Sequence, residues 1–285
     1  MPLLPRLLLP CCPLLAGVLM GHIQPIGLLL GCLFISLVLM PLRLPQWLWS
    51  LLTLIASVLL AAHLLPGFVP WIIAEPQRIS ADAAPYLLRL SWDKLLVGVT
   101  LLAWWLGLPS RPNPRPRFVV PIFIVTLLAV PGLALLLGVV AWQPKWPAML
   151  GAWLAINLAV AVLAEELLFR GLLQTRLVGW LGMWPGILLT ALLFGAVHIP
   201  FSPTFAMVAA VAGLGYGMAM QASGRLSVAI ALHGLVNLIH FTLLSYRCAA
   251  PRQWDTANGG TRTAARRLRR HSSIRSPVRQ SAICR

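Results

Sequence analysis

Long stretches without charge dominate this 285-residue chain and limit what it can fold into. Only 10% of the residues are charged and 59% are hydrophobic, whereas soluble domains have roughly 25% and 45–50%. This composition excludes a solvated α/β enzyme, a disordered chain and a disulfide-rich secreted scaffold. Because a backbone in lipid must satisfy its own hydrogen bonds, each apolar run is expected to be a helix. Nine runs fit: 7–20, 26–40, 47–65, 95–108, 119–142, 147–169, 185–199, 204–221 and 226–245.

The sequence therefore predicts an all-α, polytopic integral membrane bundle of about eight or nine membrane helices. Residues 1–93 are expected to hold N-terminal membrane helices and an extracytoplasmic loop, and 94–246 a membrane-embedded core. Residues 247–285 are Arg-rich, lack apolar periodicity and are predicted to form a disordered basic tail. The net charge is +16, but ten of the 22 basic residues follow Tyr246, so no nucleic-acid-binding face is expected. The tail is either a polybasic segment attracted to anionic lipid or a segment without a role.

The distribution of arginine predicts the orientation, because cytoplasmic loops of membrane proteins are enriched in basic residues. With loops numbered alternately from a cytoplasmic amino terminus, most arginines outside the tail fall on the inside, and Arg170 and Arg176 are assigned to an inside loop. The outside loop 66–93 offsets Arg78 and Arg89 with acidic residues. The expected location is a bacterial inner (plasma) membrane, with the lipid bilayer as a partner.

Two adjacent carboxylates, Glu165 and Glu166, lie inside an apolar run. A charge deep in the bilayer costs roughly 2.5–3.5 kcal/mol on insertion scales, so the pair requires an explanation. Glu166 precedes Arg170 by four residues, which places both on one helix face as an ion pair. Glu165 is rotated by about 100° from Glu166 and can face another neighbour. One carboxylate is therefore predicted to be structural and the other available for chemistry; alternatively, both only hold helices together.

Two histidines and an amide follow in later apolar runs. His198 ends one run, and His233 and Asn237, four residues apart, share one helix face. A carboxylate and an imidazole can share a water molecule and act as general base. An imidazole and an amide can also stabilise the oxyanion of a tetrahedral intermediate. Alternatively, Glu165, His198 and His233 could bind zinc with an open position for water, and either chemistry ends in amide hydrolysis by activated water.

These motifs resemble those of the CPBP intramembrane protease family, which comprises CAAX prenyl endopeptidases and bacteriocin-processing (Abi) proteins. Glu165-Glu166-Leu-Leu-Phe-Arg170 matches EExxxR, Phe194-Gly-Ala-Val-His198 matches FxxxH, and His233-Gly-Leu-Val-Asn237 matches HxxxN. The resemblance covers about 147–245. It implies that Glu165 and His198 activate water, that His233 and Asn237 stabilise the oxyanion, and that Glu166 and Arg170 support them. It leaves open whether the mechanism uses zinc or no metal.

The function favoured at this point is an intramembrane endopeptidase that cleaves a membrane-delivered peptide or protein. One alternative is a non-catalytic membrane protein of the bacteriocin-immunity or scaffold type, in which the polar cluster only orders helices. Another is a proton-coupled transporter that uses buried Glu and His as a relay, although no paired broken helices favour it. The substrate, its prenylation and the oligomeric state do not follow from the sequence.

Overall fold

The computed structural model describes residues 2–79, 85–109 and 115–245; the predicted tail 247–285 lies outside these residues. The described part is all-α apart from two short paired strands, β1 (Trp71–Ile72) and β2 (Arg89–Leu90). The helices before the long central helix are α1 (Leu3–Leu19), α2 (Pro25–Leu39), α3 (Gln46–Ala61), α4 (Trp92–Trp105), η1 (Pro116–Phe118) and α5 (Val119–Leu136). Those after it are α9 (Met183–Ala196), α10 (Pro203–Ser223) and α11 (Leu226–Leu243).

The central helix runs without a break over Leu150–Leu181. It consists of α6 (Leu150–Ile156), η2 (Asn157–Val162), α7 (Leu163–Glu166), η3 (Leu167–Gln174) and α8 (Thr175–Leu181), of which η2 and η3 are π-helical. When these five segments are counted as one continuous helix, and η1 is counted with α5, the described part of the chain has nine helices.

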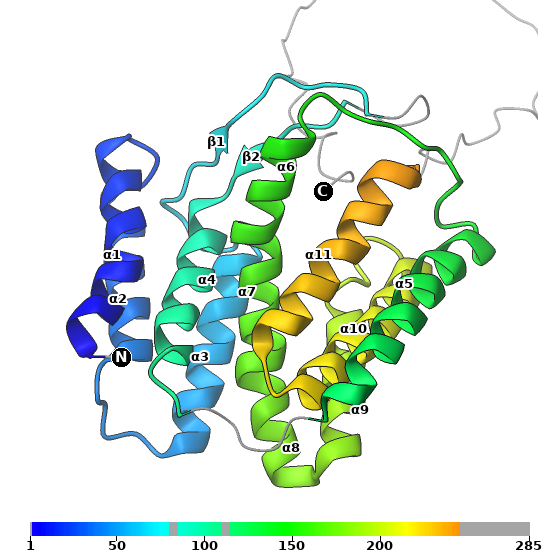
Figure 1. The fold of residues 1–285 in the computed structure, drawn as a ribbon. Helices are drawn as coiled ribbons and strands as arrows, with labels where there is room; N and C mark the ends of the chain where they lie inside the picture. Colours follow the sequence, from blue (N-terminus) through cyan, green and yellow to red (C-terminus); the bar gives the residue numbers. More distant parts are fainter. Residues whose placement is uncertain (1, 80–84, 110–114, 246–285) are drawn as a thin grey trace, which may run out of the picture.

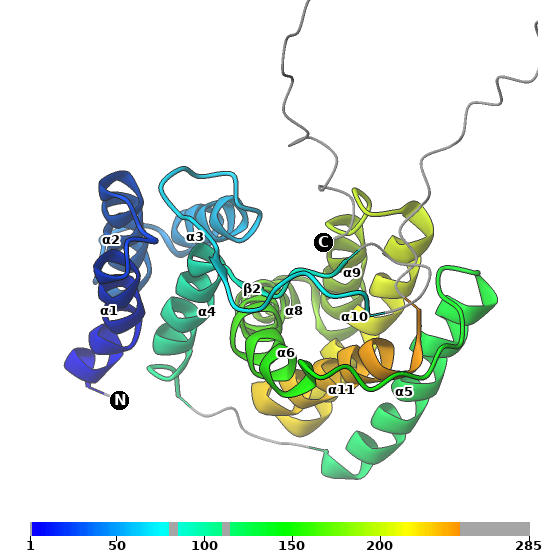
Figure 2. The ribbon, with the colours of Figure 1, turned by 90° about the horizontal axis from the view of Figure 1, so that it is seen from above.

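The central helix separates two groups of helices. Seen from above in Figure 2, α1 to α4 lie on one side of it, and α5, α9, α10 and α11 lie on the other. Helix α4 packs directly against η2, α7 and η3, while α9, α10 and α11 contact η3 from the opposite group. Figure 1 shows the same bundle from the side, with the β1–β2 segment crossing one end. A residue on the central helix can therefore meet partners from both groups.

The outer surface of the bundle is apolar, as a lipid-facing surface must be. On α5, Val120, Ile124 and Leu128 are spaced four residues apart and are 65%, 54% and 70% exposed. These residues form one stripe along the helix. The polar side chains of the central helix, in contrast, point into the protein, where Glu166 and Arg170 are fully buried. This arrangement identifies an integral membrane protein.

Four helices are long and apolar enough to cross a bilayer: Pro116–Leu136, Leu150–Leu181, Pro203–Ser223 and Leu226–Leu243. Four shorter apolar helices accompany them within the described residues, namely α1, α2, α3 and α9. The nine predicted runs thus correspond to nine helices, and the all-α prediction is confirmed.

Two of the predicted helix ends are wrong by more than four residues, and several other boundaries differ by three or four. The run 147–169 continues to Leu181, so Arg170 and Arg176 lie within the central helix rather than in a loop. The run 119–142 ends as a helix at Leu136, and α4 begins at Trp92 rather than near residue 95. In each case the predicted boundary was placed according to a single charge or proline near the helix end. The packing of the helix, which the sequence does not show, decides where it begins or ends.

The two ends of the bundle differ in charge. At the lower end in Figure 1, the Arg6 side chain donates to the Ala103 carbonyl, and the Arg115 amide donates to the Ala222 carbonyl. These contacts bring the amino terminus of α1 to the end of α4, and the 115–118 segment to the end of α10. At the other end, the 62–91 segment meets α11 through the Tyr86 and Phe241 rings. Glu75, the acidic residue of the described loops, lies in the 62–91 segment at this second end and offsets part of the charge of Arg78 and Arg89.

Candidate active site

The central helix places Glu165 and Glu166 in the short α-helical segment α7, between two π-helical segments. π-Helical turns are rare and occur mostly at functional sites, because the extra residue per turn changes which side chains share a face. Glu166 is fully buried, whereas the Glu165 side chain is 23% exposed. The two carboxylates therefore occupy different environments, as their rotation on the helix predicted.

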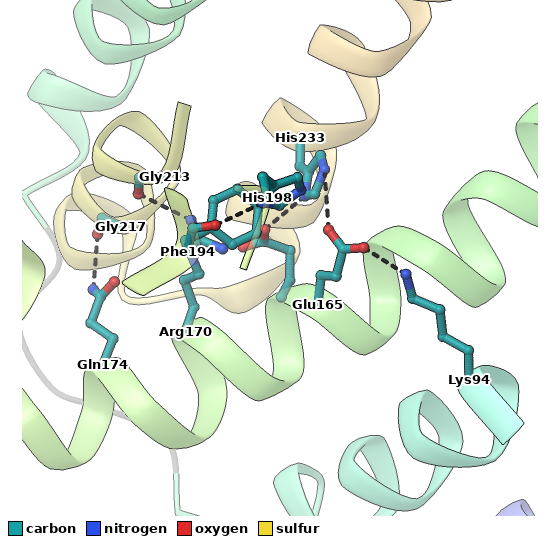
Figure 3. Close-up of polar contacts among 10 residues, drawn as sticks. Lys94, Glu165, Arg170, Gln174, Phe194, His198, Gly213, Gly217 and His233 are labelled. Atoms are coloured by element: carbon teal, nitrogen blue, oxygen red, sulfur yellow. Dashed lines mark hydrogen bonds and ion pairs between the residues drawn. The ribbon is translucent and has the colours of Figure 1, made fainter. Parts of the chain in front are cut away.

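Glu166 forms the predicted ion pair with Arg170, with 3.0 Å between Oε1 and Nη1. Arg170 is fully buried and also donates from Nη2 to the Gly213 carbonyl on α10, at 3.1 Å. Its guanidinium lies over the rings of Phe194, at 4.4 Å, and Tyr216, at 5.1 Å. These contacts fasten the central helix to α9 and α10, and Figure 3 shows Arg170 and its bond to the Gly213 carbonyl on one side of the cluster.

One turn further along the same helix, the Gln174 side-chain amide donates to the Gly217 carbonyl at 3.0 Å. Arg170 and Gln174 thus bind carbonyl groups four residues apart on α10, at Gly213 and Gly217. Glycine permits this close approach: a Cβ at Gly213 would lie 3.2 Å from Arg170 Nη2, and one at Gly217 2.6 Å from Gln174 Oε1.

His233 on α11 lies between the two carboxylates. Its Nδ1 is 2.8 Å from Glu166 Oε1, and its Nε2 is 4.0 Å from Glu165 Oε2. A carboxylate oxygen only accepts hydrogen bonds, so the proton belongs on Nδ1. In the neutral imidazole, Nε2 is then an acceptor that faces a second acceptor, Glu165 Oε2. The Tyr216 ring stacks on His233 at 4.5 Å and fixes the plane of the imidazole.

The other oxygen of Glu165 binds Lys94, the fourth residue before Gly98 on α4. Lys94 Nζ lies 2.7 Å from Glu165 Oε1, and the two side chains are 21% and 23% exposed. The helices come close beside this pair, because a Cβ added at Gly98 would lie 3.3 Å from the Ala164 nitrogen. Figure 3 shows Glu165 between Lys94 on one side and His233 on the other.

His198 and Asn237 lie on the same cavity as His233, which has a volume of about 90 Å³. His198 Nδ1 is 2.7 Å from the Phe194 carbonyl of its own helix. A carbonyl only accepts, so His198 also has a free acceptor at Nε2. Asn237 donates to the Asn157 side-chain oxygen at 3.1 Å. The cavity wall is otherwise largely aliphatic and comes from α5, α10 and α11.

The structure thus gathers the residues predicted from the sequence, with one difference in pairing. Among the hydrogen bonds and ion pairs of the described residues, the imidazole that meets Glu165 is that of His233, and no such bond joins Glu165 to His198. The His198 imidazole lies within electrostatic range of the Glu165 carboxylate but bonds to Phe194.

Sequence reasoning missed four residues around this site. Lys94, Asn157 and Tyr216 contact Glu165, Asn237 and His233 respectively, and His240 lines the cavity. Lys94 could have been found, because it is one of only two lysines and lies at the edge of an apolar run. Tyr216 and Asn157 had no comparable distinguishing feature in the sequence.

The donor set does not fit a metal ion as it stands. The described residues contain no group of three or more His, Cys, Asp or Glu side chains arranged to hold one. Glu165, the acid in the predicted zinc set, is already paired with the ammonium of Lys94.

This combination defines a polytopic membrane protein with a buried carboxylate–imidazole cluster beside a cavity in the bundle. Residues 145–239 match the family described as type II CAAX prenyl endopeptidase, Rce1-like. This segment is a domain of that family, which confirms the resemblance to CPBP proteases seen in the three motifs. No curated protein and no solved structure matches the chain.

Proposed function

We propose that this protein is an intramembrane endopeptidase that hydrolyses a peptide bond of a membrane-associated protein with a water molecule activated by Glu165. The observation that supports it best is the facing pair of acceptors, Glu165 Oε2 and His233 Nε2, 4.0 Å apart. Two acceptors at this separation are satisfied when a water molecule donates one hydrogen to each. Such a water is held beside a general base, next to the cavity that His233, His198 and Asn237 line and that a peptide carbonyl can enter.

In the proposed reaction, Glu165 accepts a proton from the water while the oxygen attacks the carbonyl carbon. The carbonyl π electrons move to the oxygen, and an Asn237 amide hydrogen stabilises this oxyanion. The carbon–nitrogen bond then breaks, and the proton held by Glu165, relayed through His233, passes to the leaving nitrogen. His198 Nε2, on the same cavity, is an alternative acceptor to His233 for the second hydrogen of the water. Glu166 and Arg170 act indirectly, because Glu166 fixes the His233 tautomer and Arg170 neutralises Glu166.

The environment supports a membrane-delivered substrate. The cavity is lined by aliphatic residues of α5 and α10 next to the polar groups, so an extended apolar segment can lie along it. The arginines at the lower end of the bundle in Figure 1 favour placing that end on the cytoplasmic side of a bacterial inner membrane. Helix α11 then ends on the extracytoplasmic side, close to the 62–91 segment.

The test uses purified protein in lipid vesicles with membrane-anchored reporter proteins that end in prenylated or unprenylated CAAX tetrapeptides. Glu165→Ala, His198→Ala and His233→Ala should each abolish cleavage without changing elution from a sizing column. His22→Ala is the matched control, because His22 stacks on Trp92 and lies beside Trp71, away from the cluster, and it should cleave normally. Full activity of Glu165→Ala would refute the mechanism. If the wild type binds the reporters but cleaves none of them, the alternative of a non-catalytic scaffold protein would be favoured.

A further inference from the structure

The buried cluster has a charge-balance problem that the family motif alone does not solve. The motif holds two carboxylates, Glu165 and Glu166, but a single guanidinium. Arg170 is fully buried and is committed to Glu166 and to the Gly213 carbonyl. A carboxylate within a membrane protein requires its own partner, because an unpaired buried charge is strongly destabilising. Glu165 therefore needs a counter-ion from another part of the chain.

Lys94 supplies that charge from α4, outside the matched residues 145–239. We propose that Lys94 is a positioning residue of the active site: its ammonium holds Oε1 of Glu165, which leaves Oε2 directed at His233. The inference rests on the proposed function and assigns a part of the site to the amino-terminal helices. With Lys94 included, two carboxylates meet two cations, and His233 between them is neutral.

The surroundings of Lys94 direct its ammonium toward Glu165. The neighbouring acid, Asp93, is the other carboxylate that could attract it. Asp93 Oδ2, however, is 2.7 Å from His63 Nδ1, and Asp93 Oδ1 accepts the backbone amide of Lys94 at 2.8 Å. Both Asp93 oxygens are thus occupied, and the ammonium crosses to the central helix.

The helix packing is built for this contact. Gly98 lies one turn after Lys94, and Ala164 directly precedes Glu165. A Cβ at Gly98 would lie 3.3 Å from the Ala164 nitrogen and 3.5 Å from its Cα, so a larger side chain would separate α4 from α7. The close approach sets the distance that the lysine side chain has to span. Helix α4 is therefore a structural part of the active site. Residues 145–239, which match the family, contain only a part of that site.

The experiment compares the wild type with Lys94→Met and Lys94→Cys in the vesicle assay. Displacing a catalytic group by an ångström can reduce a rate by about 100-fold, so Lys94→Met should lower kcat by about that factor with KM little changed. Treatment of Lys94→Cys with 2-bromoethylamine creates a side chain with an ammonium at nearly the length of lysine. This treatment should restore most of the lost kcat. The same treatment of Lys94→Met controls for alkylation of the native cysteines and should restore nothing.

Lys145→Met removes the only other lysine and is the matched control, which should keep the kcat of the wild type. Wild-type kcat in Lys94→Met, or absence of rescue in alkylated Lys94→Cys, would overturn the inference. A second measurement does not depend on activity: Lys94→Met should lower the unfolding temperature in detergent, and adding Glu165→Gln should recover part of it. Strictly additive effects of the two substitutions would also overturn the inference. Absence of any cleavage by the wild type would instead refute the proposed function.

Discussion

The substitution Arg170→Met tests whether the buried ion pair organises this half of the bundle. It removes the guanidinium that pairs with Glu166 at 3.0 Å and binds the Gly213 carbonyl at 3.1 Å. Methionine has a similar length and no charge, so the space stays largely filled. Glu166 remains fully buried and keeps only the hydrogen bond from His233. The substitution therefore leaves an uncompensated carboxylate in the protein and also removes the bond to Gly213 and the cation–π contact with Phe194.

The structure sets the expected size of the effect. Removing one partner of a buried ion pair costs about 3–5 kcal/mol of folding free energy. Solvent screening does not lower this cost here, because both side chains are fully buried. The cation–π contact with Phe194, at 4.4 Å, adds about 1–2 kcal/mol. Since 1 kcal/mol shifts Tm by about 2–4 °C in a protein of 150–250 residues, Arg170→Met should lower Tm by about 10 °C or more.

The assay is thermal unfolding in mixed micelles, followed by tryptophan fluorescence, which measures Tm. The matched variant is Arg170→Met combined with Glu166→Gln, which removes both charges but retains an acceptor for His233 Nδ1. Because the uncompensated charge is then gone, the double variant should be more stable than Arg170→Met alone. A double variant as unstable as the single one, or less stable, would show that charge pairing is not what Arg170 provides.

Three further results are expected. Asn237→Ala should lower kcat by about 10²–10³-fold, as loss of an oxyanion donor does, and circular dichroism should show an unchanged fold; unchanged kcat would remove Asn237 from the mechanism. Gly186→Ala should destabilise the protein by about 1–3 kcal/mol in the micelle assay, because the new Cβ would lie 2.6 Å from the Val178 nitrogen. Gly179→Ala is its control, since nothing lies within 4 Å of that Cβ. Chelation should leave vesicle cleavage unchanged, because Lys94 occupies one oxygen of Glu165; loss of activity restored by zinc would contradict this.

Much of the fold followed from hydropathy alone, because every lipid-exposed segment must satisfy its backbone internally and therefore becomes a helix. The pair Glu166–Arg170 also followed, since a spacing of four residues is a local property of one helix. The extent of the central helix did not follow. Arg170 was expected to end it, but packing against α9 and α10 gives the guanidinium a buried partner set, so the helix continues to Leu181.

The contacts between distant segments could not be predicted from spacing. Lys94 and Glu165 are 71 residues apart, and Asn157 and Asn237 are 80 apart. Which faces of two helices meet depends on small residues such as Gly98, whose effect appears only when the partner helix is known. The nearer imidazole of Glu165 was also unpredictable, because His198 and His233 approach the cavity from different helices.

The location of the central helix and the chemistry of the site have one physical cause. Adjacent residues on a helix diverge by about 100°, so Glu165 and Glu166 face different surroundings, although His233 on α11 lies near both carboxylates. Glu165 meets Lys94 on α4, whereas Glu166 meets Arg170 on its own helix and His233 on α11. The counter-ion of Glu165 thus comes from the group α1 to α4, which lies on one side of the central helix in Figure 2. Without α4, Glu165 would lose the ammonium of Lys94. In the proposed mechanism, the amino-terminal helices therefore supply the counter-ion of the general base.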